Sequence, residues 1–225
     1  ANSGLLILSK REIEEVARQG SGRGFQVNTH AIGDRANRTV LHAYAAVLRG
    51  KNDKRFSIEH AQVISVPDFK LFSDNSVIAS IQSTHATSDM RWAEARLGPD
   101  RLAGAWSARR FLNAGARIAN GSDFPVEDAN PLFGFYAAIT RQDHSGQPSG
   151  GFLPGEKLTR EEALRSWTLD AAYAAFEENS KGTLEAGKLA DFIMLSKDIM
   201  IIDPLEILNA RVTMTVLGGK IVHSE

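Results

Sequence analysis

Apolar and polar stretches alternate over the first two-thirds of the chain in a pattern that predicts strands followed by helices. Short apolar runs with strand character fall within residues 24–30, 55–60, 77–82 and 117–123. Stretches with apolar residues at helical spacing follow them, at about residues 34–50, 66–75, 100–115 and 131–142. This alternation indicates an α/β fold with a parallel sheet.

Local signals add two further helices and a change of pattern near the C-terminus. Ser9 with Glu12, and Thr159 with Glu162, form capping boxes that start helices running to about residues 19 and 176. Residues 190–198 and 212–225 then predict strands, with the pair at 218–219, Gly-Gly, as a hairpin turn. The chain is therefore predicted to contain four β–α units followed by a small β appendage.

Composition and charge exclude several classes of protein. Of 225 residues, 43% are hydrophobic, enough for a sizeable core. The net charge is −1 and no basic stripe occurs, so we expect no nucleic-acid partner. No stretch approaches the roughly 20 apolar residues of a membrane span. Because cysteine is absent, disulfides and thiol catalysis are excluded; that absence favours the cytoplasm and leaves the localisation open.

Three of the predicted strands finish on side chains that can do chemistry. They end at His30, at His60 and at Asp123, while His85 follows the remaining strand. Parallel α/β folds place their sites at the carboxyl ends of strands. Two neutral imidazoles suit zinc and its neighbours, and a carboxylate can accept a proton from water whose pKa a metal lowers to about 7. The pattern is typical of metal-assisted hydrolysis.

Each of these residues also has a purely structural interpretation. His30 could be a hydrogen-bonded residue at a strand end, and His60 could pair with its neighbour Glu59. Asp123 could be a turn residue or a helix cap, and Asp34 is expected to cap the helix that follows it. The pattern of residues alone leaves both interpretations open.

Five motifs, in order along the chain, carry a resemblance to a known family. The sequence resembles the amidohydrolase superfamily, and most closely its YtcJ-like branch, amidohydrolase family 3. The motifs are "THAIGDRANRTVLHAY", "RFSIEHAQVIS", "IQSTHATSDMRWAEARLG", "ARIANGSDFPVEDANPLFGFYAAITRQ" and "GTLEAGKLADFIMLSKD". Such proteins are metal-dependent hydrolases of amide-type C–N bonds, built as a (β/α)8 barrel with a small β-sandwich.

The resemblance implies a role for several residues. His30 and His60 match the metal ligands after the fifth and sixth barrel strands. Asp123 matches the residue after the eighth strand that binds metal and handles the proton. The metal is expected to be divalent, with zinc favoured and one or two ions in the intact enzyme. His85 is a weaker candidate, for contact with a small amide-type substrate.

The resemblance also implies a division of the chain. Residues 1–180 correspond to strands 5–8 of the barrel, and residues 181–225 to the C-terminal strands of the sandwich. The family's His-x-His pair occurs nowhere in the 225 residues. The chain is therefore expected to be the C-terminal portion of a longer amidohydrolase, which self-associates or binds the missing half through apolar faces at "FQVNTH" and "VIASIQ".

Two other functions are alternatives to that of a hydrolase. A catalytically silent half-barrel could act as a structural or binding module. An open nucleotide-binding sheet is disfavoured, because no Gly-rich phosphate loop follows any predicted strand.

Overall fold

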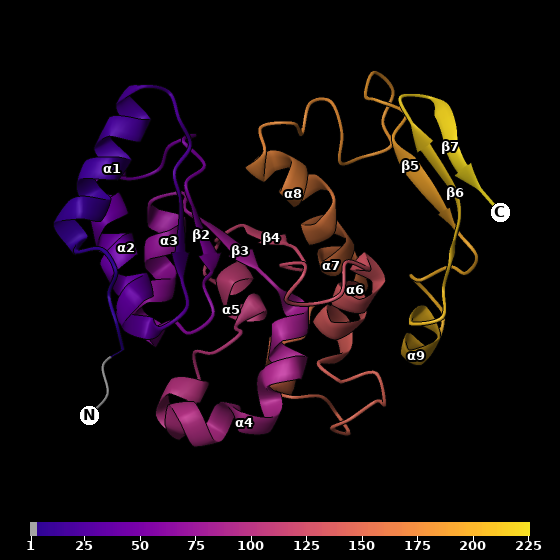
Figure 1. The fold of residues 1–225 in the computed structure, drawn as a ribbon, viewed down its shortest axis with the longest axis horizontal. Helices are drawn as coiled ribbons and strands as arrows, with labels where there is room; N and C mark the ends of the chain where they lie inside the picture. Colours follow the sequence, from indigo (N-terminus) through magenta and orange to yellow (C-terminus); the bar gives the residue numbers. More distant parts are fainter. Residues whose placement is uncertain (1–3) are drawn as a thin grey trace. The chain divides into compact units, whose positions relative to one another are not determined.

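The computed structural model describes residues 4–225 as an α/β protein that divides into two compact units. The first unit contains residues 1–82 and 89–119, and the second contains residues 83–88 and 120–225. Figure 1 shows the order of the elements along the chain. Among the described residues, no helix is both long enough and apolar enough to cross a membrane.

The elements follow the predicted strand–helix order over the first 120 residues. They are α1 (Lys10–Gly22), β1 (Asn28–Ala31), α2 (Asp34–Leu48), β2 (Ser57–His60), η1 (Val66–Asp68), α3 (Phe69–Asp74), β3 (Ile78–Ile81), α4 (Ser83–Leu102), α5 (Ala108–Asn113) and β4 (Ile118–Asn120). The capping box predicted at Ser9 and Glu12 is confirmed at the start of α1. All four predicted strands are present, although each is shorter than its apolar run.

The four strands form one sheet in the order β1-β2-β3-β4 (Figure 1). The first two pairs are parallel, with Thr29 opposite Ile58 and Ile58 opposite Ala79. Ile58, Ile78 and Ile118 are buried almost completely. Parallel strands covered on both faces carry such buried apolar residues, which helps the sequence to identify the inner strands.

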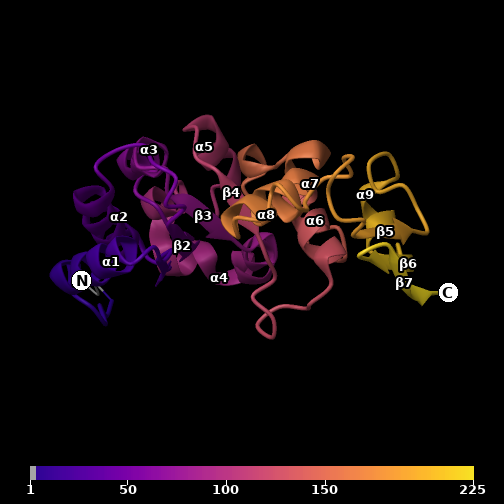
Figure 2. The same cartoon turned by 90° about the horizontal axis from the view of Figure 1, so that it is seen from above.

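A buried tyrosine fixes helix α2 to the sheet. The hydroxyl of Tyr44 lies 2.6 Å from Thr29 Oγ1 and within hydrogen-bond distance of the Val27 and Ser57 carbonyls. Helix α1 packs beside α2 (Figures 1 and 2). These contacts determine where the carboxyl ends of β1 and β2 lie.

Helix α4 begins much earlier than the helix predicted at residues 100–115. Its first turns contain hydroxyl residues that resemble a loop in the sequence, but the Thr87 side chain donates back to the Thr84 carbonyl at 2.9 Å. The predicted helix is also interrupted, because residues 103–107 pair with the segment after β2. A Cβ at Gly104 would lie 1.9 Å from the Ile64 carbonyl oxygen, so this approach requires glycine.

The second unit contains the remaining helices and a separate small sheet. Its further elements are α6 (Pro131–Thr140), η2 (Pro154–Glu156), α7 (Arg160–Trp167), α8 (Leu169–Ala174), β5 (Phe192–Leu195), α9 (Pro204–Ile207), β6 (Val212–Leu217) and β7 (Lys220–Ser224). The capping box of Thr159 and Glu162 is confirmed. The prediction of one continuous helix from this capping box to about residue 176 is wrong. The backbone of Thr168 is not helical, and this residue separates α7 from α8.

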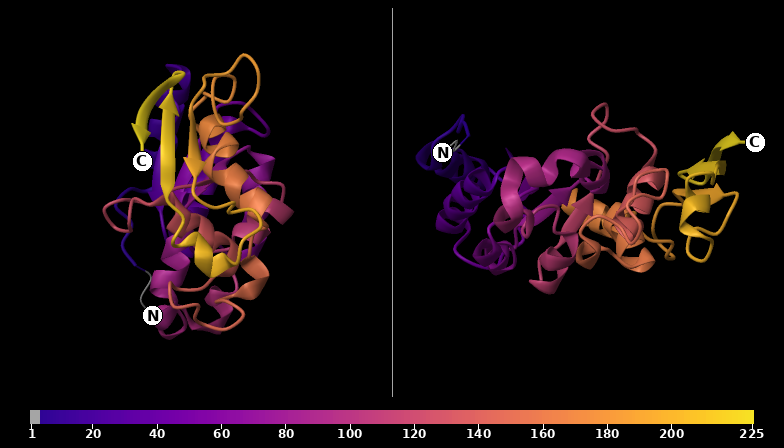
Figure 3. Two further views of the ribbon diagram at one scale, coloured as in Figure 1. Left: turned by 90° about the vertical axis from the view of Figure 1, so that its right-hand side faces the viewer. Right: turned by 90° about the horizontal axis from the view of Figure 1, so that it is seen from below.

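The small sheet is antiparallel, in the order β5-β6-β7 (Figures 2 and 3). The predicted hairpin is confirmed: Gly218 and Gly219 both have positive φ, as a two-residue turn of this kind requires. Unlike the parallel strands, β7 is exposed along its whole length. The short helix α9 between β5 and β6 was not predicted.

Candidate functional site

The end of β2 holds His60 in an unusual backbone conformation. His60 and Ala61 both have left-handed φ angles, of 74° and 44°. Residues other than glycine adopt this region at an energetic cost, and such residues concentrate at functional sites. The segment is held by backbone hydrogen bonds from Val63 to Ile32 and from Trp106 to Gln62, at 2.9 and 2.7 Å. The conformation is therefore imposed by neighbouring backbone.

The first unit brings the two predicted histidine ligands together. His30 and His60 lie with their ring centroids 4.6 Å apart, at the ends of the adjacent strands β1 and β2. The Nδ1 atom of His60 lies 2.8 Å from Oε1 of Gln82. When Nδ1–H donates this bond, Nε2 keeps its lone pair, which is the form of histidine that binds metals.

The sequence allowed an ion pair between Glu59 and His60, but in the structure the two side chains bond to different partners. Its carboxylate accepts a hydrogen bond from the Ser57 hydroxyl, whereas the His60 ring bonds to Gln82. Within the first unit, the side-chain amide of Gln82 thus orients the His60 ring.

Asn37 connects the two strand ends, a role that sequence analysis missed. Its buried Nδ2 lies 3.1 Å from the carbonyl oxygen of Ala31, 3.0 Å from that of Gly33 and 3.2 Å from that of Val63. The backbone that follows β1 is thereby fixed to the backbone that follows β2. Gly33 is also the N-cap residue of α2, so the prediction that Asp34 caps this helix is wrong. Asp34 lies in the first helical turn, where a carboxylate favours the helix dipole.

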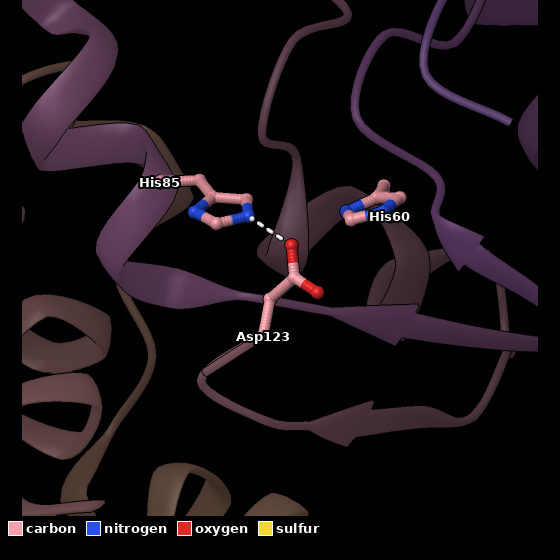
Figure 4. A group of neighbouring side chains, drawn as sticks. All are labelled: His60, His85 and Asp123. Carbon is pink, nitrogen blue, oxygen red and sulfur yellow. Dashed lines mark hydrogen bonds and ion pairs between the residues drawn. The ribbon is translucent and has the colours of Figure 1, made fainter. Parts of the chain in front are cut away.

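In the second unit, Asp123 follows β4 and also has a left-handed backbone, with φ of 59°. Its carbonyl accepts a hydrogen bond from the Val126 amide at 2.8 Å, so the turn geometry considered for this residue is confirmed. Its side chain extends to His85, whose Nε2 lies 3.3 Å from Oδ2 of Asp123 (Figure 4). The turn therefore does not exclude a chemical role for the carboxylate.

His85 lies between two carboxylates of the same unit. Its Nδ1 is 3.0 Å from Oε1 of Glu127, and the Ser88 hydroxyl donates to the same oxygen at 2.6 Å. The His85 side chain is only 10% exposed. Substrate contact by His85 stays a prediction, although these contacts engage both ring nitrogens. Neither Glu127 nor Ser88 was identified from the sequence.

Each unit carries side chains of the kind that bind divalent cations. His60, His85 and Asp123, the side chains drawn in Figure 4, each carry an atom that metals accept as a ligand. Imidazole and carboxylate are among the ligands that zinc and its neighbours accept.

The sequence is similar to the amidohydrolase family over residues 2–223. It is 34% identical over 226 residues to "Protein LONG AFTER FAR-RED 3" of Arabidopsis thaliana, covering 97% of this chain and 38% of that protein. It is 29% identical to YtcJ of Bacillus subtilis (strain 168), covering 100% and 42%. It is 28% identical to the N-substituted formamide deformylase of Arthrobacter pascens, covering 94% and 39%. The chain thus spans about two-fifths of the length of these relatives.

Solved structures agree with this relationship. An uncharacterized metal-dependent hydrolase from Pyrococcus furiosus superposes with a TM-score of 0.71 at 29% identity, over 83% of this chain and 36% of that one. Atrazine chlorohydrolase TrzN from Arthrobacter aurescens TC1, complexed with zinc, has the same fold, with a TM-score of 0.67 at 19% identity over 98% and 49% of the two chains. The chain belongs to the amidohydrolase family, in its YtcJ-like branch.

Proposed function

We propose that this chain forms the C-terminal portion of a metal-dependent hydrolase that acts on amide-type C–N bonds. The observation that carries the proposal is the left-handed backbone at His60 and Asp123, two positions that the resemblance to the family implies are metal ligands. The formamide deformylase among the relatives supports a C–N bond as the target. The hydrolase from P. furiosus supports metal dependence.

The proposal includes a specific architecture. Strands β1 to β4 would be strands 5–8 of a (β/α)8 barrel, with residues 1–180 in the barrel and residues 181–225 in a composite β-sandwich. The parallel sheet and the separate antiparallel sheet support this division. The coverage of about two-fifths of each relative supports a larger whole.

His30, His60 and Asp123 are proposed to hold the metal. The close pairing of the two imidazoles and the hydrogen bond between His60 and Gln82 support the first two ligands. Zinc is favoured by this donor set and by the zinc in TrzN. When bound, a divalent cation polarises a carbonyl and lowers the pKa of water to about 7.

The chain's own residues would then manage the proton. As water attacks the carbonyl carbon, Asp123 accepts the proton that the water loses. Asp123 then returns this proton to the nitrogen as the C–N bond breaks. The exposure of its side chain, at 36%, leaves the carboxylate within reach of a small substrate.

The test is a pair of substitutions in the natural full-length polypeptide. Asp123→Asn keeps the shape of the side chain and removes the proton acceptor, so turnover of amide substrates should fall by about 10²-fold or more. His30→Ala should lower both turnover and metal content. Near-normal turnover in Asp123→Asn would show that another residue is the base.

A separate measurement addresses the metal itself. Two imidazoles and one carboxylate are a small ligand set, so we expect these 225 residues alone to lose metal during dialysis. Elemental analysis checks this directly. One tightly held zinc per chain after dialysis would contradict the expectation. Full-length protein that neither retains metal nor hydrolyses amides would instead favour a catalytically silent module.

A further inference from the structure

The second unit contains a connected series of polar side chains that ends at the proposed base. The hydroxyl of Ser88 donates to Glu127 at 2.6 Å, and Glu127 lies 3.0 Å from Nδ1 of His85. Nε2 of His85 in turn lies 3.3 Å from Oδ2 of Asp123, the contact drawn in Figure 4. Ser88 and His85 belong to the first turns of α4, whereas Asp123 and Glu127 belong to the loop after β4. The series therefore links two segments that are far apart in the sequence.

A second set of hydrogen bonds fixes the spacing of these segments. Asn120, the last residue of β4, accepts from the Ser83 amide at 3.1 Å and donates to the Ser83 hydroxyl at 2.8 Å. It also lies 3.3 Å from the Ser166 hydroxyl of α7. Since Asn120 and Ser83 are both buried, the start of α4 is held beside the end of β4 without help from His85.

The two carboxylates on either side of His85 differ in burial. The side chains of His85, Glu127 and Asp123 are 10%, 19% and 36% exposed. An imidazole engaged at both nitrogens cannot rotate without losing both contacts. The orientation of the ring is therefore determined at Glu127, the more buried carboxylate, and is passed to Asp123, the more exposed one.

We propose that Glu127 is a positioning residue, which acts through His85 to hold Asp123 in one side-chain rotamer. The proposal rests on the function assigned to Asp123 above. A proton acceptor uses one carboxylate oxygen, so a contact that holds Oδ2 fixes the direction of the whole group. Correct orientation of a reacting group supplies a large share of enzymatic rate enhancement.

The first experiment measures the rotamer of Asp123 without reference to activity. Isotope-labelled protein gives the χ1 populations of Asp123 from three-bond couplings in solution NMR. We expect a single rotamer in the wild type and in Glu127→Gln, which keeps an acceptor oxygen for the ring. Glu127→Ala should give a mixture of rotamers. Glu94→Ala, the same truncation at an exposed position of α4, is the matched control and should leave Asp123 unchanged.

The results distinguish a positioning role from a merely structural one. A single, wild-type rotamer in a folded Glu127→Ala variant overturns the proposal. If that variant fails to fold, Ser88→Ala removes the hydrogen bond that orients Glu127, and it should produce a measurable second rotamer. An unchanged Asp123 in Ser88→Ala would then overturn the proposal.

The second experiment uses turnover by the full-length enzyme. Glu127→Ala should lower kcat about tenfold to hundredfold, the usual effect of removing a partner of this kind, with little change in KM. Glu127→Gln should restore most of kcat. If the rotamer responds as expected while no variant, Asp123→Asn included, alters turnover, the proposed function fails and the positioning of Asp123 stands.

Discussion

The strands of the parallel sheet and those of the small antiparallel sheet bury their apolar side chains to very different degrees. Ile58 in β2 and Ile78 in β3 are at most 1% exposed, whereas Ile193 in β5 and Ile221 in β7 are 48% and 62% exposed. Both sheets carry the β-branched residues that strands favour. The inner strands β2 and β3 are therefore part of a buried core, whereas the small sheet keeps large apolar side chains exposed.

The two sheets also differ in what their ends carry. His30 and His60 end strands of the parallel sheet, and the second-unit residue Asp123 follows β4. No histidine or carboxylate cluster able to hold a metal occurs on β5 to β7 within residues 4–225. A buried sheet with short strands holds reactive side chains in fixed positions. The exposed sheet instead carries large apolar side chains at its surface.

The largest expected difference between the sheets is in stability. Ile58→Ala deletes buried methyl groups from the core and should lower the free energy of unfolding by about 2–5 kcal/mol. Ile221→Ala, the same change on an exposed strand, should alter it by less than about 0.5 kcal/mol. Urea unfolding of the two variants measures both values. Equal losses would mean that β7 is covered in solution.

Self-association should depend on the small sheet. Strand β7 is an edge strand whose apolar residues Ile221 and Val222 are exposed, and such an edge can pair with a second copy. We therefore expect light scattering to give a mass above the 24.5 kDa of one chain. Ile221→Lys should weaken the association about tenfold, because charged side chains protect such edges.

A matched control distinguishes association through β7 from nonspecific association through any exposed apolar residue. Val16 on α1 is similarly exposed, at 56%, and Val16→Lys should leave the measured mass unchanged. A monodisperse monomer in the wild type would contradict the prediction and favour a self-sufficient module.

The expectation that "VIASIQ" supplies the exposed face is wrong, since Ile78 and Ile81 of β3 are buried. For "FQVNTH" it holds in part, since Phe25 is 67% exposed.

The sequence predicts features that are encoded locally. Each strand of the large sheet lies in or beside a short apolar stretch, each capping box lies within four residues, and the Gly218–Gly219 turn depends on two adjacent glycines. Those signals need no knowledge of distant contacts. The start of α4 was missed for the opposite reason, since its hydroxyl residues resemble a loop until the backbone carbonyls they bond to are known.

The sequence identified single residues of the candidate site, but it did not identify the contacts between them. His30, His60 and Asp123 stand out because they end apolar runs. Glu127 resembles any solvated acid in a loop, and its contact with Ser88 spans 39 positions. Asn37 reaches Val63 across 26 positions. Contacts of that kind depend on how the chain folds over long distances in the sequence, so no periodicity in the sequence predicts them.

A smaller effect concerns the tyrosine that joins α2 to the parallel sheet. Tyr44→Phe removes a hydroxyl that contacts Thr29 and two strand carbonyls. A buried hydrogen bond of this type contributes about 1 kcal/mol, so the variant should be less stable by that amount at pH 7. Guanidinium unfolding at pH 7 and at about pH 10.5 measures the difference between the two proteins.

The pH dependence of that difference is the sharper part of the prediction. Burial raises the pKa of Tyr44 above its ordinary value, which is about 10. The unfolded chain therefore loses this proton first as the pH rises, and the folded state binds more protons. Stability contributed by the hydroxyl is present below about pH 10 and declines above it. Burial likewise raises the pKa of Tyr136. Because Tyr136 is present in both proteins, its contribution cancels in the difference between their stabilities. The gap between wild type and Tyr44→Phe should therefore narrow at alkaline pH, and a constant gap would show that the hydroxyl reaches solvent and that α2 is less firmly docked on the sheet than its burial indicates.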